Sequence, residues 1–221
     1  MKSFIERENE IFDVLDDFNK AELKYVLIGG YAVSAYMHRF SVCIDKNDLS
    51  LFKDILKAKH FLLVKRKELE DIYKGEFECY TKKVKLPVTV DLMIGSVVSR
   101  QTNASVSFEQ LYKNSVIKRI TGIEKAISAR IPLKEILIAL KINAARLTDA
   151  RDIVALCQNV DFAIVAEFMD KSKEVQNNLD NLFSYFKSDN FKDAFKGVFS
   201  IEKLPKGNIE NAVKLMERLK A

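Results

Sequence analysis

Two aspartates have the surroundings expected of metal ligands. Asp45 ends the apolar segment FSVCID, and Asp91 lies within the apolar segment VTVDLMI. Burying an unpaired carboxylate is costly, so an acid inside a predicted strand is expected near a sheet edge, beside a cation or on a metal ion. Carboxylate oxygens are the ligands that Mg²⁺ and Mn²⁺ prefer in proteins. Asp45 and Asp91 are therefore candidate ligands for such an ion.

A glycine pair precedes both acids, at a point where a predicted strand gives way to a helix. Gly29 and Gly30 follow the strand-forming residues KYVLI and precede the helical segment YAVSAYMH. Glycine lets the backbone approach a phosphate closely, and the first amides of a following helix attract anions. The pair indicates a phosphate-binding turn, although a simple tight turn explains it equally well.

A second group of charged residues lies in the segment PLKEILIALKINAARLTDARDIVAL. Lys141, Arg146, Asp149 and Asp152 are one or two helical turns apart, so several of them share a face if one helix runs through the segment. From this spacing alone, they form a ladder of salt bridges on an exposed face.

Taken in order, these segments resemble the nucleotidyltransferase superfamily, which has the polymerase-β-like fold, and especially its branch of abortive-infection (AbiEii) toxins. The resemblance covers about residues 24–156. It consists of a strand ending in Gly-Gly, a helix, Arg-x-(Ser/Thr)-x-Asp-x-Asp starting at Arg39, a lone Asp in a later strand, and Lys-x-x-x-Ala-Arg-x-x-Asp-x-x-Asp starting at Lys141.

The resemblance implies transfer of a nucleoside monophosphate from an NTP to a protein or RNA acceptor with the help of Mg²⁺ or Mn²⁺. In such two-metal sites the ions neutralise charge on the attacking and leaving oxygens. Asp45 and Asp91 are implied as catalytic metal ligands, and Lys141 as a catalytic contact to phosphate. The implied nucleotide-binding residues are Gly29, Gly30, Arg39, Ser41 and Asp149. A toxin of this branch also implies a possible antitoxin partner.

One position departs from the family pattern. Arg39, Ser41 and Asp45 are in register with the motif, but Cys43 stands where its first acid is expected. A thiol is a soft and poor ligand for Mg²⁺. A second alignment treats residues 43–45 as the tail of the strand and leaves only Asp91 of the metal site. A catalytically impaired relative that binds nucleotide or a partner is therefore the alternative function.

Hydrophobic periodicity predicts the elements that hold these residues. Helices are expected over 3–20, 48–59 with Asn47 as cap, and 107–113, and strands over 24–28, 40–45, 61–66, 75–82 and 88–94, with a strand pair within 116–130. From Pro132, as a first helical position, helices continue to the C-terminus. The predicted fold class is α+β: a nucleotidyltransferase-like core over 1–125, with a mixed sheet and flanking helices, and a C-terminal helical bundle over 126–221 packed on it.

Charge adds a third functional hypothesis. The chain of 221 residues carries a net charge of +5, but residues 100–151 contain ten Lys or Arg against four acids, a local excess of +6. An excess of this kind suits a phosphate-bearing partner, although ordinary solvated surfaces explain it as well. An RNA-binding adaptor that uses this region is therefore a further possibility.

Composition excludes several classes of protein. With 48% hydrophobic and 30% charged residues, the chain is expected to fold around a real core. Three separated cysteines without a CxxC pair support neither a disulfide framework nor a cysteine-based zinc site, and two histidines support no histidine-rich metal site. No segment has the pattern of a targeting peptide or a membrane span, so a cytoplasmic location is expected.

Overall fold

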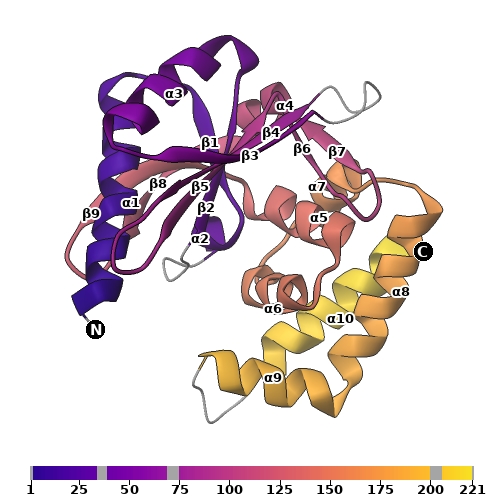
Figure 1. Cartoon of the computed structure of the whole chain (residues 1–221). Coiled ribbons are helices and arrows are strands. Elements are labelled where there is room, and N and C mark those ends of the chain that lie inside the picture. The colour runs from indigo at the N-terminus through magenta and orange to yellow at the C-terminus, as the bar shows by residue number, and fades with distance from the viewer. Residues whose placement is uncertain (1, 34–38, 69–74, 200–205, 221) are drawn as a thin grey trace. The chain divides into compact units, whose positions relative to one another are not determined.

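The computed structural model describes residues 2–33, 39–68, 75–199 and 206–220 (Figure 1). The chain forms two compact units, Met1–Val98 with Ser105–Leu133 and Ser99–Ala104 with Lys134–Ala221. The fold class is α+β, as predicted, because a mixed sheet with helices is followed by a wholly helical segment.

The first unit is built on one mixed five-stranded sheet with the strand order β1-β2-β5-β4-β3. The strands are β1 (Tyr25–Ile28), β2 (Arg39–Ile44), β3 (Leu62–Glu68), β4 (Glu76–Lys82) and β5 (Val88–Ile94). β2 and β5 are parallel, whereas the pairs β1–β2, β4–β5 and β3–β4 are antiparallel. The five predicted strands and their union in a single sheet are confirmed.

Strand alternation divides this sheet into two faces. One face packs against α1 (Lys2–Lys20) and α3 (Leu49–Ala58) and holds the core of the unit. Its fully buried side chains include Phe18, Val42, Phe52, Val90 and Leu92. The neighbouring positions along β2 and β5, which include Ser41, Cys43 and Asp91, therefore belong to the opposite face.

The chain turns from β2 into α3 through the short 3-10 helix η1 (Lys46–Asp48). The predicted helix is present, but its predicted cap is not, because Asn47 lies inside η1. Asp48 is the N-cap position of α3 and makes no side-chain capping hydrogen bond, whereas Asp45 caps η1: its Oδ1 accepts a hydrogen bond from the backbone N–H of Asn47 at 2.9 Å. Asp45, directly after the strand, thus stabilises the turn that leads to α3.

After β5 come the short hairpin β6 (Ser96–Val98) and β7 (Ser105–Ser107), the helix α4 (Phe108–Lys113), and the hairpin β8 (Ser115–Thr121) and β9 (Ala126–Pro132). The predicted strand pair around Gly122 is confirmed. Glu8 on α1 accepts a hydrogen bond from the N–H of Ile123 at 2.6 Å, which ties this hairpin to the first unit. The first unit therefore extends to Leu133 and not only to about residue 125, and Pro132 ends a strand where a helix start was predicted.

The second unit is helical, with α5 (Lys134–Ala144), α6 (Leu147–Leu156), α7 (Phe162–Phe168), α8 (Lys173–Lys187), α9 (Asp189–Phe199) and α10 (Lys206–Lys220). Its core includes the buried side chains of Ile138, Ile153, Leu179, Phe186 and Met216. The charged motif does not lie on one continuous helix, because the helix breaks at Ala145, which has a positive φ of 42°. The motif is therefore divided between α5 and α6.

The strand β3 forms one edge of the large sheet and pairs, within the described residues, only with β4. Its first three residues, Leu62, Leu63 and Val64, have exposed side chains. The pairing register shifts between Leu63 and Lys65, which is the mark of a β-bulge.

Among the described helices, none has both the length and the apolar character that crossing a membrane requires.

Candidate functional site

Three of the predicted nucleotide-site residues come together on the sheet. Ser41 on β2 and Asp91 on β5 are register partners, so their side chains share a face, and Ser41 Oγ donates to Asp91 Oδ2 at 3.5 Å. Gly29 directly follows β1 beside them with a φ of 76°, and a Cβ at this position would be 4.0 Å from Ser41 Oγ. Asp91 is only 4% exposed, whereas Ser41 is half-buried. A hydroxyl and a carboxylate thus meet next to a glycine turn.

Asp45 does not join this group. It follows Ser41 by four residues, so a strand rise of about 3.3 Å per residue places it about 13 Å along the sheet from the level of Asp91. Two carboxylates that share one Mg²⁺ must each bring an oxygen to about 2.1 Å from the ion. The Oδ1 atom of Asp45 is moreover engaged in capping η1. The predicted pair of metal ligands is therefore not assembled.

Cys43 occupies the position between these two levels. It lies two residues beyond Ser41 on the same strand and is fully buried. Burial raises the pKa of its thiol far above the ordinary value, so the thiol is neutral at physiological pH, and sulfur is in any case a soft and poor ligand for Mg²⁺. Within the described ranges, no group of three or more His, Cys, Asp or Glu side chains is arranged to hold a metal ion. The donor set around Asp91 does not fit a pair of Mg²⁺ or Mn²⁺ ions.

The other residues that the resemblance implied in the first unit are placed only in part. Gly30 is the first residue of α2 (Gly30–Val33). Arg39 begins β2, and its backbone pairs with that of Thr89 on β5. The side chain of Arg39 lies outside the described part of the chain.

In the second unit, the four charged residues of the helical motif form one network. Lys141 Nζ donates to Asp149 Oδ1 at 2.9 Å and also to Asp152 Oδ2. Arg146 binds Asp149 in a two-pronged manner, with Nε and Nη2 at 2.8 Å and 3.2 Å from the two carboxylate oxygens. The backbone N–H of Arg146 also donates to Asp149 Oδ2 at 3.1 Å. The break at Ala145 brings these groups together.

Burial makes this network different from the expected ladder. The side chain of Asp149 is 0% exposed and that of Lys141 is 7% exposed, whereas that of Arg146 is 61% exposed. Burial on its own would raise the pKa of Asp149, but the hydrogen bonds from Arg146 and the charges of Lys141 and Arg146 outweigh it and lower that pKa below its usual range. In return, Asp149 raises the pKa of Arg146. Lys141 is thus held by two carboxylates, and Arg146 is the motif cation that faces solvent.

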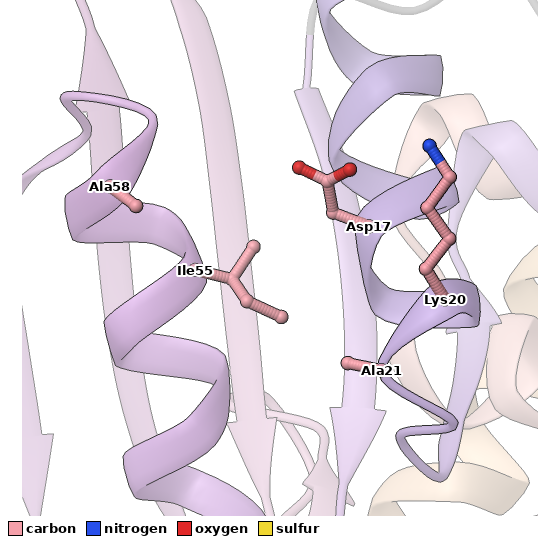
Figure 2. A pocket seen from close by; sticks show the side chains of 5 residues that line it. All are labelled: Asp17, Lys20, Ala21, Ile55 and Ala58. Atoms are coloured by element: carbon pink, nitrogen blue, oxygen red, sulfur yellow. The ribbon is translucent and has the colours of Figure 1, made fainter.

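A separate depression lies between α1 and α3 (Figure 2). It has a volume of about 360 Å³ and is lined by Asp17, Lys20, Ala21, Ile55 and Ala58. None of these residues was predicted as a site residue. Asp17 pairs with Lys59 at 2.8 Å and Lys20 pairs with Asp16 at 2.6 Å, so its charges are already neutralised. The depression offers no chemistry beyond these surface ion pairs.

No protein-family model matches the chain, and no curated protein sequence matches it significantly.

Proposed function

We propose that the chain is a nucleotidyltransferase-like protein that binds a nucleotide beside Gly29, Ser41 and Asp91 but does not transfer it through a pair of metal ions. The observation that carries this proposal is the register of β2 on β5. Ser41 is the residue of β2 that pairs with Asp91. The positions of β2 that alternate onto this face within two residues of Ser41 are 39, 41 and 43, which hold Arg, Ser and Cys. None of them supplies the second carboxylate that two-metal catalysis needs.

The chemistry of the remaining residues suits a nucleotide bound without metal. Asp91 accepts hydrogen bonds, and a ribose hydroxyl or a base amino group donates them. Ser41 adds a hydroxyl that both donates and accepts. Because the Asp91 carboxylate repels phosphates, the phosphates are expected toward the Gly29-Gly30 turn, where the backbone allows close approach. Nucleotide affinity should consequently not require Mg²⁺.

Metal-dependent transfer to a protein or RNA acceptor is the competing function. One feature supports it: Asp91 lies on β5, the strand that pairs with the strand carrying Arg39, Ser41 and Cys43. Titration calorimetry with each of the four NTPs, with and without Mg²⁺ or Mn²⁺, tests binding. Incubation with α-labelled NTPs and cell extract tests transfer.

We expect binding in the absence of metal and no labelled product. Metal-dependent labelling of a protein or RNA would show that the chain is an active transferase and overturn the proposal. If none of the four NTPs binds, the proposed nucleotide-binding function is wrong as a whole.

A substitution at position 43 tests the register argument directly. Cys43→Asp restores an acid on the face of Asp91, so Mg²⁺ should tighten nucleotide binding by roughly tenfold or more, the factor that about 1.4 kcal/mol supplies. Cys43→Ser is the matched control and should leave binding independent of metal. Because Cys43 is fully buried, Ser41→Asp at the half-buried neighbouring position is a second test if Cys43→Asp does not fold. A folded acid variant without any metal effect would contradict the register argument.

A further inference from the structure

The β8–β9 hairpin carries positive charge without compensating acids on either strand. Its strands, SVIKRIT and AISARIP, contain Lys118, Arg119 and Arg130 and no Asp or Glu. We propose that the outer face of this hairpin binds the sugar-phosphate backbone of a single-stranded nucleic acid. The proposal is independent of the nucleotide site, because the two surfaces share no residue.

Cross-strand pairing shows which side chains occupy the outer face. The pairs Ile120–Ile127, Lys118–Ala129 and Val116–Ile131 alternate with the pairs Ile117–Arg130 and Arg119–Ser128. Ile120, Ile127 and Ile131 pack against the core of the first unit. The intervening pairs consequently face away from the core, and Ile117 is 65% exposed.

The hairpin is held firmly, so its cations are positioned before a partner arrives. Besides the hydrogen bond between Glu8 and Ile123, Asn19 Nδ2 donates to the carbonyl of Ser128 at 2.8 Å. The guanidinium of Arg130 lies 4.4 Å from the ring centroid of Tyr112, and its Nη1 donates to the carbonyl of Ser115 at 3.4 Å. Ordering a cation in advance reduces the entropy lost on binding.

The two arginines form the centre of the proposed surface. Arg119 and Arg130 are diagonal neighbours on the outer face, which places their Cα atoms about 7–8 Å apart. Arg119 is exposed, and no described residue forms an ion pair with it. Lys118 pairs with the buried Ala129 on the other face of the hairpin, so it does not belong to this surface. A guanidinium matches two phosphate oxygens at once, which favours a phosphate chain as partner.

Fluorescence anisotropy with a labelled oligouridylate RNA and the corresponding single-stranded DNA tests the proposal. Affinity should fall steeply as salt rises, because each neutralised phosphate contributes about −0.7 to the slope of log K against log salt. The variant Arg119→Ala/Arg130→Ala should lose about tenfold or more in affinity and about 1.4 from the magnitude of that slope, since two phosphate contacts are removed.

The matched control is Lys20→Ala/Lys85→Ala, which removes two exposed lysines of the same unit that already pair with Asp16 and Glu6. This control should bind RNA as the parent does. Equal affinity for RNA and DNA would show that the phosphates alone are recognised. Tighter binding of RNA would show that the 2′-hydroxyls are contacted as well. The proposal would be overturned if no oligonucleotide binds, or if both double variants lose the same affinity. Equally tight binding of polyglutamate would also overturn it, because that result indicates an acidic protein as the partner.

Discussion

The two units treat the residues of their charged motifs in opposite ways. In the second unit, a helix break at Ala145 lets Lys141 reach Asp149 and Asp152. In the first unit, an unbroken strand keeps Asp45 about 13 Å along the sheet from the level of Asp91. Sequence spacing is the same kind of information in both cases, but the backbone decides whether the side chains meet. The charged residues of the second unit form a network with no net charge, whereas the two predicted metal ligands of the first unit stay apart.

The largest expected effect is on the network of the second unit. Lys141→Met leaves the buried carboxylate of Asp149 without its ammonium partner, and removing one member of a buried ion pair costs roughly 3–5 kcal/mol. Urea unfolding measures the loss. Lys192→Met, which removes an exposed lysine paired with Asp189, is the control and should leave stability unchanged. If both variants unfold at the same urea concentration, the network does not stabilise the unit.

A smaller effect is expected from Asp149→Asn, and it should depend on pH. At neutral pH, the loss of charged hydrogen bonds should cost roughly 2–3 kcal/mol. Because the pKa of Asp149 is lowered in the folded protein, the stability that its carboxylate contributes is present above the unfolded pKa of about 3.9 and is lost as the pH falls through the lower folded value. Urea midpoints of the parent and the variant should therefore converge in strong acid. A constant difference between them at all pH values would contradict this assignment.

Two glycines offer a comparison of packing between the units. A Cβ on Gly122 would overlap the carboxylate of Glu8 and lie 2.9 Å from Phe12 Cε2. Gly122→Ala should therefore destabilise the first unit by about 1–3 kcal/mol. A Cβ on Gly207 meets nothing within 4 Å, and since this residue lies in α10, Gly207→Ala should be neutral or slightly stabilising. Equal thermal midpoints for both variants would show that the hairpin is not packed on α1 as described.

The smallest expected effect is the reaction of the cysteine thiols with a labelling reagent. Burial raises the pKa of Cys43 and, to about 12, the pKa of Cys157. Because the thiolate is the reactive form, Ellman's reagent at mildly alkaline pH should release almost no thiol from the folded chain. It should release three equivalents after denaturation. In intermediate urea, mass spectrometry of labelled peptides compares the units, because Cys43 reports on the first and Cys157 on the second. Rapid labelling of Cys43 in the absence of urea would contradict its burial.

The strands were predictable from sequence because their signals are local. β5 and β4 carry β-branched or aromatic residues between turn signals, and alternation on β2 and β5 fills the core with Phe40, Val42, Val90 and Leu92. The helix after β2 was also predictable from its apolar face. These properties depend on neighbours within a few residues.

The site was less predictable because its geometry depends on distant contacts. The partner of Asp91 is fixed by how β2 and β5 align across fifty positions, and the sequence around either strand does not encode that register. The left-handed conformation of Ala145 has no signal either, since a glycine or asparagine is the usual residue there. Asp45 was correctly placed at the end of its strand, but its capping role was missed because Asn47 is an equally good capping residue by type.

The irregular edge strand β3 has a consequence for how the molecule behaves at high concentration. An open sheet edge with consecutive Leu62, Leu63 and Val64 is a template on which a neighbouring chain can add a strand. The displaced residue after Leu63 interrupts the even row of backbone donors and acceptors, and the charge of the following Lys65 repels an identical edge. Among the described residues, the sheet therefore keeps an unpaired border while resisting fibre-like stacking of one copy on the next.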